Sequence, residues 1–102
     1  MTHELMEHRQ HYLDALERRI EEWTARVEAI EARAADADPV VKAELEEGID
    51  ELRSRLEATR DGHAQLADCD EDAWPGGRRD LDQAWSDVED AYRDLHRTLA
   101  RA

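Results

Sequence analysis

The chain has 102 residues, of which 27 are acidic and 14 basic, so its formal net charge at neutral pH is −13. Such a surface repels phosphate backbones and anionic lipid headgroups, so we expect neither nucleic-acid binding nor a membrane role. No stretch approaches the ~20 apolar residues that span a bilayer, and the N-terminus lacks the hydrophobic region of a secretory signal. With a single cysteine, no internal disulfide can form. These features predict one acidic, cytoplasmic domain over residues 1–102.

The first predicted element is a helix over residues 3–35. Apolar side chains recur every seven residues from Met6 to Ala34, and a second row of apolar positions lies between them, with Arg9 the only clear break. A heptad pattern kept along a whole segment is typical of a coiled-coil helix. The expected core positions of this helix are Leu13, Leu16, Ile20, Trp23, Val27 and Ile30.

A second helix is predicted over residues 39–67, where apolar residues again follow helical spacing. Gly48 and Gly62 each weaken it by ~1 kcal/mol relative to Ala, a cost that the apolar stripe tolerates. His63 falls in the apolar row and is expected to be a packed, hydrogen-bonded side chain. The core positions of this helix are Leu45, Ile49, Leu52 and Leu56.

The third predicted helix covers residues 72–100. Acidic and turn-forming residues precede it, and Pro75 fits the first turn if Asp72 is the N-cap. Gly76 and Gly77 weaken that turn, so we expect an irregular start. Trp85 and Tyr92 share the apolar edge of this helix, so we expect them to be core residues and not a ligand-binding box. The core positions are Leu81, Trp85, Val88, Tyr92, Leu95 and Leu99.

The junction between the first two helices permits two interpretations. Asp38 before Pro39 is typical of an N-cap followed by the first helical residue, which predicts a turn and an antiparallel three-helix coiled-coil bundle. The apolar stripe nevertheless continues in phase through residues 34–45, as it would in one long kinked helix that pairs with a shorter helix in a hairpin dimer. We favour the bundle, since a proline inside a helix costs ~3 kcal/mol.

The N-terminal segment holds the candidate metal ligands. Neighbouring turns of the first helix would place the His and Glu side chains on shared faces, where they could grip a divalent ion such as Zn²⁺ if another helix supplied a further ligand. A solvated helix start is the simpler interpretation. No Gly-rich phosphate loop and no nucleophile–base order is present, so we expect no catalysis and no cofactor. The candidate metal ligands are His3, Glu7, His8 and His11.

Four segments together resemble a family of small bacterial coiled-coil proteins that carry a stress-response assignment and no defined activity. The segments are LERRIEEWTARVEAIEARA (16–34), EEGIDELRSRLEA (46–58), DAW (72–74) and DLDQAWSDVEDAY (80–92). The family pattern has a Trp in the first long helix, here Trp23, and DAW and AW motifs about eleven residues apart, here at Trp74 and Trp85. The resemblance implies a bacterial stress role and supplies no catalytic residues.

These observations favour a non-catalytic coiled-coil protein that forms a homo-oligomer or docks a protein partner in a bacterial stress response. Two alternatives stay open: an amphipathic lipid-contacting protein, and a divalent-metal-binding module that uses the N-terminal His/Glu cluster. Interfacial lipid-binding helices carry an excess of Lys and Arg on their polar faces, and these helices do not.

Overall fold

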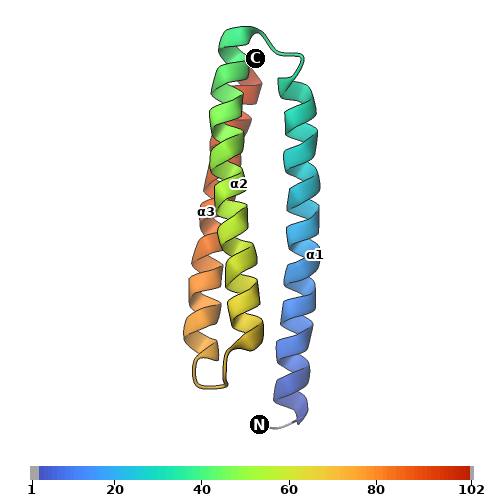
Figure 1. Ribbon diagram of the computed structural model, residues 1–102, viewed down its shortest axis with the longest axis vertical. Helices are drawn as coiled ribbons and strands as arrows, with labels where there is room; N and C mark the ends of the chain where they lie inside the picture. The colour runs from blue at the N-terminus through green and yellow to red at the C-terminus, as the bar shows by residue number, and fades with distance from the viewer. Residues whose placement is uncertain (1–2, 102) are drawn as a thin grey trace.

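The computed structural model describes the chain over residues 3–101, and the side chains of residues 6–101. Three helices, α1 (His3–Ala34), α2 (Pro39–Asp68) and α3 (Trp74–Arg101), follow one another up, down and up along a rod of 56 × 19 × 17 Å (Figure 1). The predicted antiparallel three-helix bundle is confirmed. Its predicted helix ends at 35, 67 and 100 and its third start at 72 each lie within two residues of the observed positions.

A turn at residues 35–38 reverses the chain between α1 and α2 (Figure 1). The backbone N–H groups of Asp36 and Ala37 each donate to a carbonyl oxygen three residues earlier, at 3.2 Å, and so tighten the end of α1. Pro39 occupies the start of α2, where its missing N–H leaves no hydrogen bond unmade. Asp38 is the N-cap residue as predicted, although its side chain makes no capping hydrogen bond. The alternative of one helix continuing through residue 39 is therefore wrong.

The turn between α2 and α3 is capped by a different aspartate from the one expected. The backbone N–H of Ala73 donates to Oδ1 of Asp70 at 2.9 Å, and α3 begins at the next residue, Trp74. The helix therefore begins two residues after the predicted start at 72, and the condition that Asp72 is its N-cap is not met. Asp70 stands three residues before Ala73, the spacing at which an aspartate side chain can accept a hydrogen bond from the backbone N–H at a helix start. Pro75 lies in the first turn of α3, as expected.

One hydrophobic core runs along the rod between the three helices. Every residue named above as a core position of the three helices is buried except Tyr92, which is half-buried. Thr59 is fully buried among them, and its hydroxyl donates to the carbonyl oxygen of Leu56 at 2.6 Å. His63 is half-buried, with Nε2 at 3.1 Å from the carbonyl oxygen of Leu13. The helical periodicity thus identifies the inner face of each helix.

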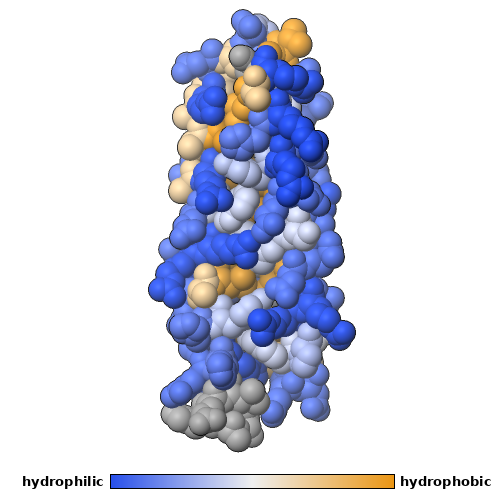
Figure 2. Space-filling model, turned by 180° about the vertical axis from the view of Figure 1, so that it is seen from behind, coloured by the Kyte–Doolittle hydropathy of each residue, from blue (hydrophilic) through white to orange (hydrophobic). Residues whose placement is uncertain are grey.

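Met6 departs from this pattern, because its side chain is 57% exposed although it stands in the first heptad row. Met6 lies in the first turns of α1, and in Figure 1 the start of α1 reaches beyond the α2–α3 turn. The back of the rod is mostly hydrophilic, with apolar surface gathered near the α1–α2 turn and along a narrow seam (Figure 2). Val40, at the start of α2, is 74% exposed.

The three helices are unequally spaced. Glycines bring α2 and α3 together: a Cβ atom at Gly48 or Gly62 would lie within 3 Å of a leucine methyl group of α3. By contrast, no described Cα atom of α1 lies within 8 Å of a Cα atom of α3. Large side chains fill that wider seam. The bundle is therefore a close α2–α3 hairpin with α1 packed against it.

Candidate functional site

Aromatic and arginine side chains form two clusters where α1 meets α3. The central aromatic cluster consists of Trp23, Trp85 and Tyr92, with Arg19 and Arg26 over its rings. The terminal aromatic cluster consists of Arg9, Tyr12, Trp74 and Arg78.

The central aromatic cluster is part of the core. The Trp23 ring centroid lies 6.1 Å from that of Trp85 and 4.9 Å from that of Tyr92, and the two indoles are 6% and 3% exposed. The guanidinium of Arg19 lies 4.3 Å from the Trp85 ring centroid, and that of Arg26 lies 4.7 Å from the Trp23 centroid. Arginines thus cover the rings from outside, in geometry that suits cation–π attraction. The two indoles are thus buried core side chains, and Tyr92 is half-buried beside them.

The terminal aromatic cluster is more open. The rings of Tyr12 and Trp74 are half-buried and meet edge to face, with centroids 5.8 Å apart. The Arg9 guanidinium lies 4.5 Å from the Trp74 centroid, and that of Arg78 lies 4.6 Å from the Tyr12 centroid. The four side chains, two from α1 and two from α3, therefore form a row in which the two rings lie side by side and an arginine stands at each end.

Arg9, the break in the heptad, ties α1 to the end of α2. Its Nη2 donates to the carbonyl oxygen of Cys69 at 2.8 Å and lies 3.4 Å from that of Leu66. The last carbonyl groups of a helix have no intrahelical partner and carry the negative end of the helix dipole. Arg9 supplies these carbonyl groups with a hydrogen-bond donor and places a positive charge at the negative end of the helix dipole. This explains why a charged residue occupies an apolar row of α1.

Tyr12 connects this cluster to α3 through its hydroxyl, which donates to Oδ1 of Asp82 at 3.2 Å. Burial raises the pKa of the Tyr12 phenol above its ordinary value, and the charge and hydrogen bond of Asp82 add to the rise, while Arg78 opposes it. Tyr12 and Arg78 are not among the site residues predicted from the sequence. The sequence feature that could have identified them is helical spacing, because Arg9 and Tyr12 are three residues apart and Trp74 and Arg78 are four apart.

A groove of about 430 Å³ opens beside the terminal aromatic cluster. It is lined by the four side chains of that cluster together with His8, His11 and Ala15. Within the described side chains, its lining contains two arginines and two histidines and no carboxylate. This is a positively charged hollow in an acidic protein.

Two of the candidate metal ligands, His8 and His11, border this groove. Over the side chains of residues 6–101, the structure brings no three His, Cys, Asp or Glu groups together as a metal site would need. Glu7 is exposed and has an interaction of its own. The side chain of His3 lies outside the described residues, so the metal prediction for the full cluster stays a prediction.

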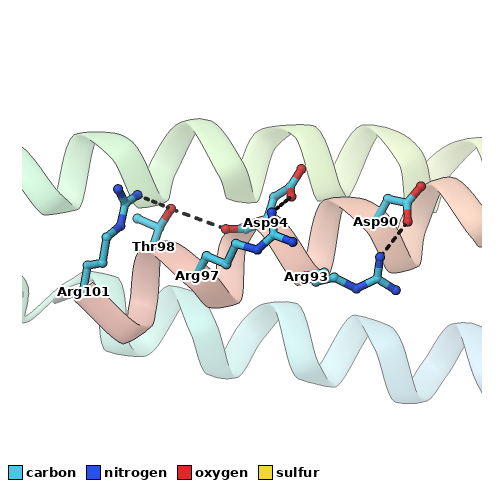
Figure 3. A network of polar contacts seen from close by, with 6 residues as sticks. All are labelled: Asp90, Arg93, Asp94, Arg97, Thr98 and Arg101. Carbon is cyan, nitrogen blue, oxygen red and sulfur yellow. Dashed lines mark hydrogen bonds and ion pairs between the residues drawn. The ribbon is translucent and has the colours of Figure 1, made fainter.

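The outer face of α3 carries a ladder of polar contacts one turn apart. Arg93 donates to Asp90 at 3.2 Å and Arg97 donates to Asp94 at 3.3 Å, all four side chains being exposed. Exposed pairs of this kind contribute ~0.3–0.5 kcal/mol each, so their main effect is to neutralise the charge of this face. The ladder comprises Asp90, Arg93, Asp94, Arg97, Thr98 and Arg101 (Figure 3).

The first half of α2 is different, because its carboxylates outnumber its basic residues. Residues 44–51 include five carboxylates and no basic side chain. Glu46, Glu47 and Asp50 are exposed, and in the described part of the chain none of them forms an ion pair. We refer to these three residues as the acidic patch of α2.

In comparisons with protein-family models, curated proteins and solved structures, nothing matches this chain. Over the described residues, none of the three helices has an apolar stretch of the length and composition that crosses a bilayer. The site geometry and the charge distribution are therefore the observations from which a function can be argued.

Proposed function

We propose that this chain is a non-catalytic helical protein that docks a basic partner protein through its acidic surface in a bacterial stress response. The observation that carries the proposal is that the apolar stripes of all three helices close on one another in a single core. Among the described residues, the large hydrophobic side chains left exposed are Met6 and Val40. Recognition of a partner therefore depends on charge and not on a free apolar face.

Self-association, which the heptad pattern alone would favour, is disfavoured in this arrangement. The stripe that would form a coiled-coil interface is already buried inside one chain, and two copies with a net charge of −13 repel each other. We therefore expect sedimentation equilibrium to give the mass of a single chain at moderate salt. A stable dimer would contradict this part of the proposal.

The acidic patch of α2 is the docking position that the charge distribution favours. In the ladder of α3, Asp90 and Asp94 are each paired with an arginine, so their charge is cancelled before a partner arrives. In the acidic patch the carboxylates are unpaired among the described residues, and basic side chains can approach them without displacing an arginine. Charges at such a surface steer encounter and set specificity more than they add affinity.

The partner is sought by cross-linking in the source bacterium under acid, oxidative and osmotic stress, followed by binding measurements with the purified proteins. We expect a partner of high isoelectric point whose affinity falls steeply between about 50 and about 300 mM salt, where the Debye length shortens from ~14 to ~6 Å. A partner whose binding is insensitive to salt would contradict recognition by charge.

A matched pair of variants locates the interface. Glu47→Gln with Asp50→Asn removes two carboxylates from the acidic patch, and Asp90→Asn with Asp94→Asn removes two from the ladder. We expect the first pair to weaken binding by about fivefold, as the loss of ~1 kcal/mol of attraction would do, and the second to leave it within about twofold. Equal effects would mean that net charge, and not this patch, governs binding.

The stress role rests on the family resemblance and has its own test. A strain that lacks the gene should lose viability under at least one of these stresses, and the wild-type chain should restore it. Restoration by the acidic-patch variant as well would separate the stress role from docking at α2.

A further inference from the structure

The groove at the terminal aromatic cluster has a charge opposite to that of the whole chain. Seven arginines of the described region form ion pairs with carboxylates, but Arg9 and Arg78, which line this groove, form none. The nearest carboxylate known to contact the cluster is that of Asp82, which accepts the hydrogen bond of the Tyr12 hydroxyl and does not line the groove. The guanidinium of Arg78 and that of Arg9, which also binds the carbonyl oxygen of Cys69, therefore both lie at the hollow, and neither has a carboxylate partner among the described residues.

The hollow has the size and the walls of a small-molecule site. Its volume of about 430 Å³ lies within the range of ~300–1,000 Å³ typical of ligand pockets. Tyr12 and Trp74 are half-buried and stand at 75° to each other, so each ring keeps part of its surface toward the opening. Ala15, whose short side chain leaves room on α1, also lines the groove. Positive groups and flat apolar walls therefore occur together.

We propose that this groove binds a small organic anion in which a phosphate or carboxylate group is attached to a flat ring. The planar guanidinium of Arg78 can hold two oxygens of such a group at once, and Arg9 adds positive charge across the rings. The ring of the ligand packs against the parts of Trp74 and Tyr12 that Arg9 and Arg78 leave uncovered, where edge-on or offset aromatic contacts are favourable. His8 and His11 supply further N–H donors at the rim.

This site is independent of the proposed docking of a partner protein. The groove lies near the α2–α3 turn, whereas the acidic patch lies toward the α1–α2 turn at the other end of the rod (Figure 1). The two proposals also invoke opposite charges. Failure of one experiment therefore leaves the other proposal untouched.

The probe is phenyl phosphate, titrated into the ¹⁵N-labelled full chain and followed by NMR. The indole N–H signal of Trp74 is assigned from the spectrum of Trp74→Phe. We expect a saturable shift of that signal with phenyl phosphate or with benzoate, and the tighter of the two identifies the preferred oxyanion. Inorganic phosphate, which has charge without a ring, should bind about two- to twelvefold more weakly, since a stacking contact is worth ~0.5–1.5 kcal/mol. Phenol, which has a ring without charge, should give no saturation.

Arg78→Gln and Arg79→Gln form the matched pair of variants, because the two arginines are adjacent and both are exposed, but only Arg78 lines the groove. We expect Arg78→Gln to raise the dissociation constant for phenyl phosphate at least about tenfold and Arg79→Gln to change it less than about twofold. Ala15→Leu, which fills the groove and removes no charge, should abolish the saturable shift while leaving helicity unchanged.

Three results would overturn the proposal. The first is the absence of a saturable Trp74 shift with both phenyl phosphate and benzoate. The second is equal affinity for phenyl phosphate and inorganic phosphate, which would show that the rings take no part. The third is an equal loss of affinity in the two arginine variants, which would indicate general electrostatic attraction. Should Arg78→Gln fail to fold, Ala15→Leu alone decides between a bound ligand and a merely structural arginine–aromatic stack.

Discussion

Gly48 lies directly against Leu95: a Cβ atom at Gly48 would stand 2.7 Å from Cδ1 of that leucine, which is itself 2% exposed. Gly62 has the same relationship to Leu81, at 2.9 Å. Because real Cβ atoms do not approach carbon this closely, a larger residue would force the leucine side chain, or α3 itself, to shift. The glycines that weaken α2 as an isolated helix therefore allow it to form the close hairpin.

We expect Gly48→Ala to lower the free energy of unfolding by about 1 kcal/mol, because overpacking a buried contact costs ~1–3 kcal/mol and the helix propensity of Ala returns ~1 kcal/mol. Gly76→Ala is the control, since no atom of another group lies within 4 Å of a Cβ there. That substitution should raise the free energy of unfolding by ~0.5–1 kcal/mol. Urea denaturation measures both. Equal stabilisation by the two substitutions would show that close approach does not require Gly48.

Arg9 provides a second prediction, on which the heptad pattern and the structure disagree. The pattern predicts that Arg9→Leu repairs an apolar row and stabilises the helix. The structure predicts a loss of ~1–2 kcal/mol in the free energy of unfolding, because a charged hydrogen bond worth ~1.5–3 kcal/mol and a cation–π contact worth ~0.5–1 kcal/mol disappear, partly offset by the apolar burial of Leu.

Arg18→Leu is the matched control for this substitution. Arg18 is exposed on the same helix, so its replacement should change the free energy of unfolding by less than ~0.5 kcal/mol. Thermal and urea denaturation of both variants give the comparison. If Arg9→Leu proves more stable than the wild type, the capping of α2 by Arg9 contributes less than the apolar contact that it replaces.

The helices and their inner faces could be predicted from the sequence because periodicity is a local property of the chain. Trp23 and Val88, for example, are placed in the core by their row alone. Helix ends depend on which side chain reaches which amide, and Asp70, Asp72 and the turn itself offer several solutions of similar energy. The start of α3 is therefore predicted two residues too early.

The terminal aromatic cluster could not be predicted in the same way. Tyr12 and Trp74 are far apart in the chain, and their contact depends on how α3 is aligned against α1 after both turns have formed. In the sequence Arg9 only interrupts the heptad pattern, and its hydrogen bond to the end of α2 becomes evident only in the folded chain. A single sequence contains the helical spacing of these residues but not the register between the helices.

Pro39 distinguishes the turn from the kinked helix that the continuous stripe also permits. At the start of α2 its ring fits the helix and restricts the unfolded chain, so Pro39→Ala should lower the free energy of unfolding by ~0.5–1 kcal/mol. Were Pro39 inside a continuous helix, the same substitution would raise stability by ~3 kcal/mol. Urea denaturation of the variant distinguishes the turn from the kinked helix, and sedimentation equilibrium checks that the variant stays a single chain. A stabilised, dimeric variant would contradict the three-helix arrangement in solution.

Tyr12 makes the stability of the bundle depend on alkaline pH. Because burial and Asp82 raise the pKa of its phenol in the folded chain, the folded state holds this proton more tightly than the unfolded state, where the pKa is ~10. The resulting stabilisation is fully present below pH ~10 and is lost as the pH rises through the higher folded value. We therefore expect the free energy of unfolding of the wild type to fall more steeply than that of Tyr12→Phe above pH ~10.

At pH 8 the comparison is different, because the phenol is protonated in both states. There Tyr12→Phe should cost only the hydrogen bond to Asp82, which is worth ~0.5–1.5 kcal/mol. Urea denaturation at pH 8, 10 and 11 gives the slopes, and Tyr92, present in both proteins, cancels from the comparison. Parallel pH profiles would mean that the phenol of Tyr12 titrates alike in the folded and unfolded chains. The contact with Asp82 would then be too weak in solution to position Tyr12 beside the groove.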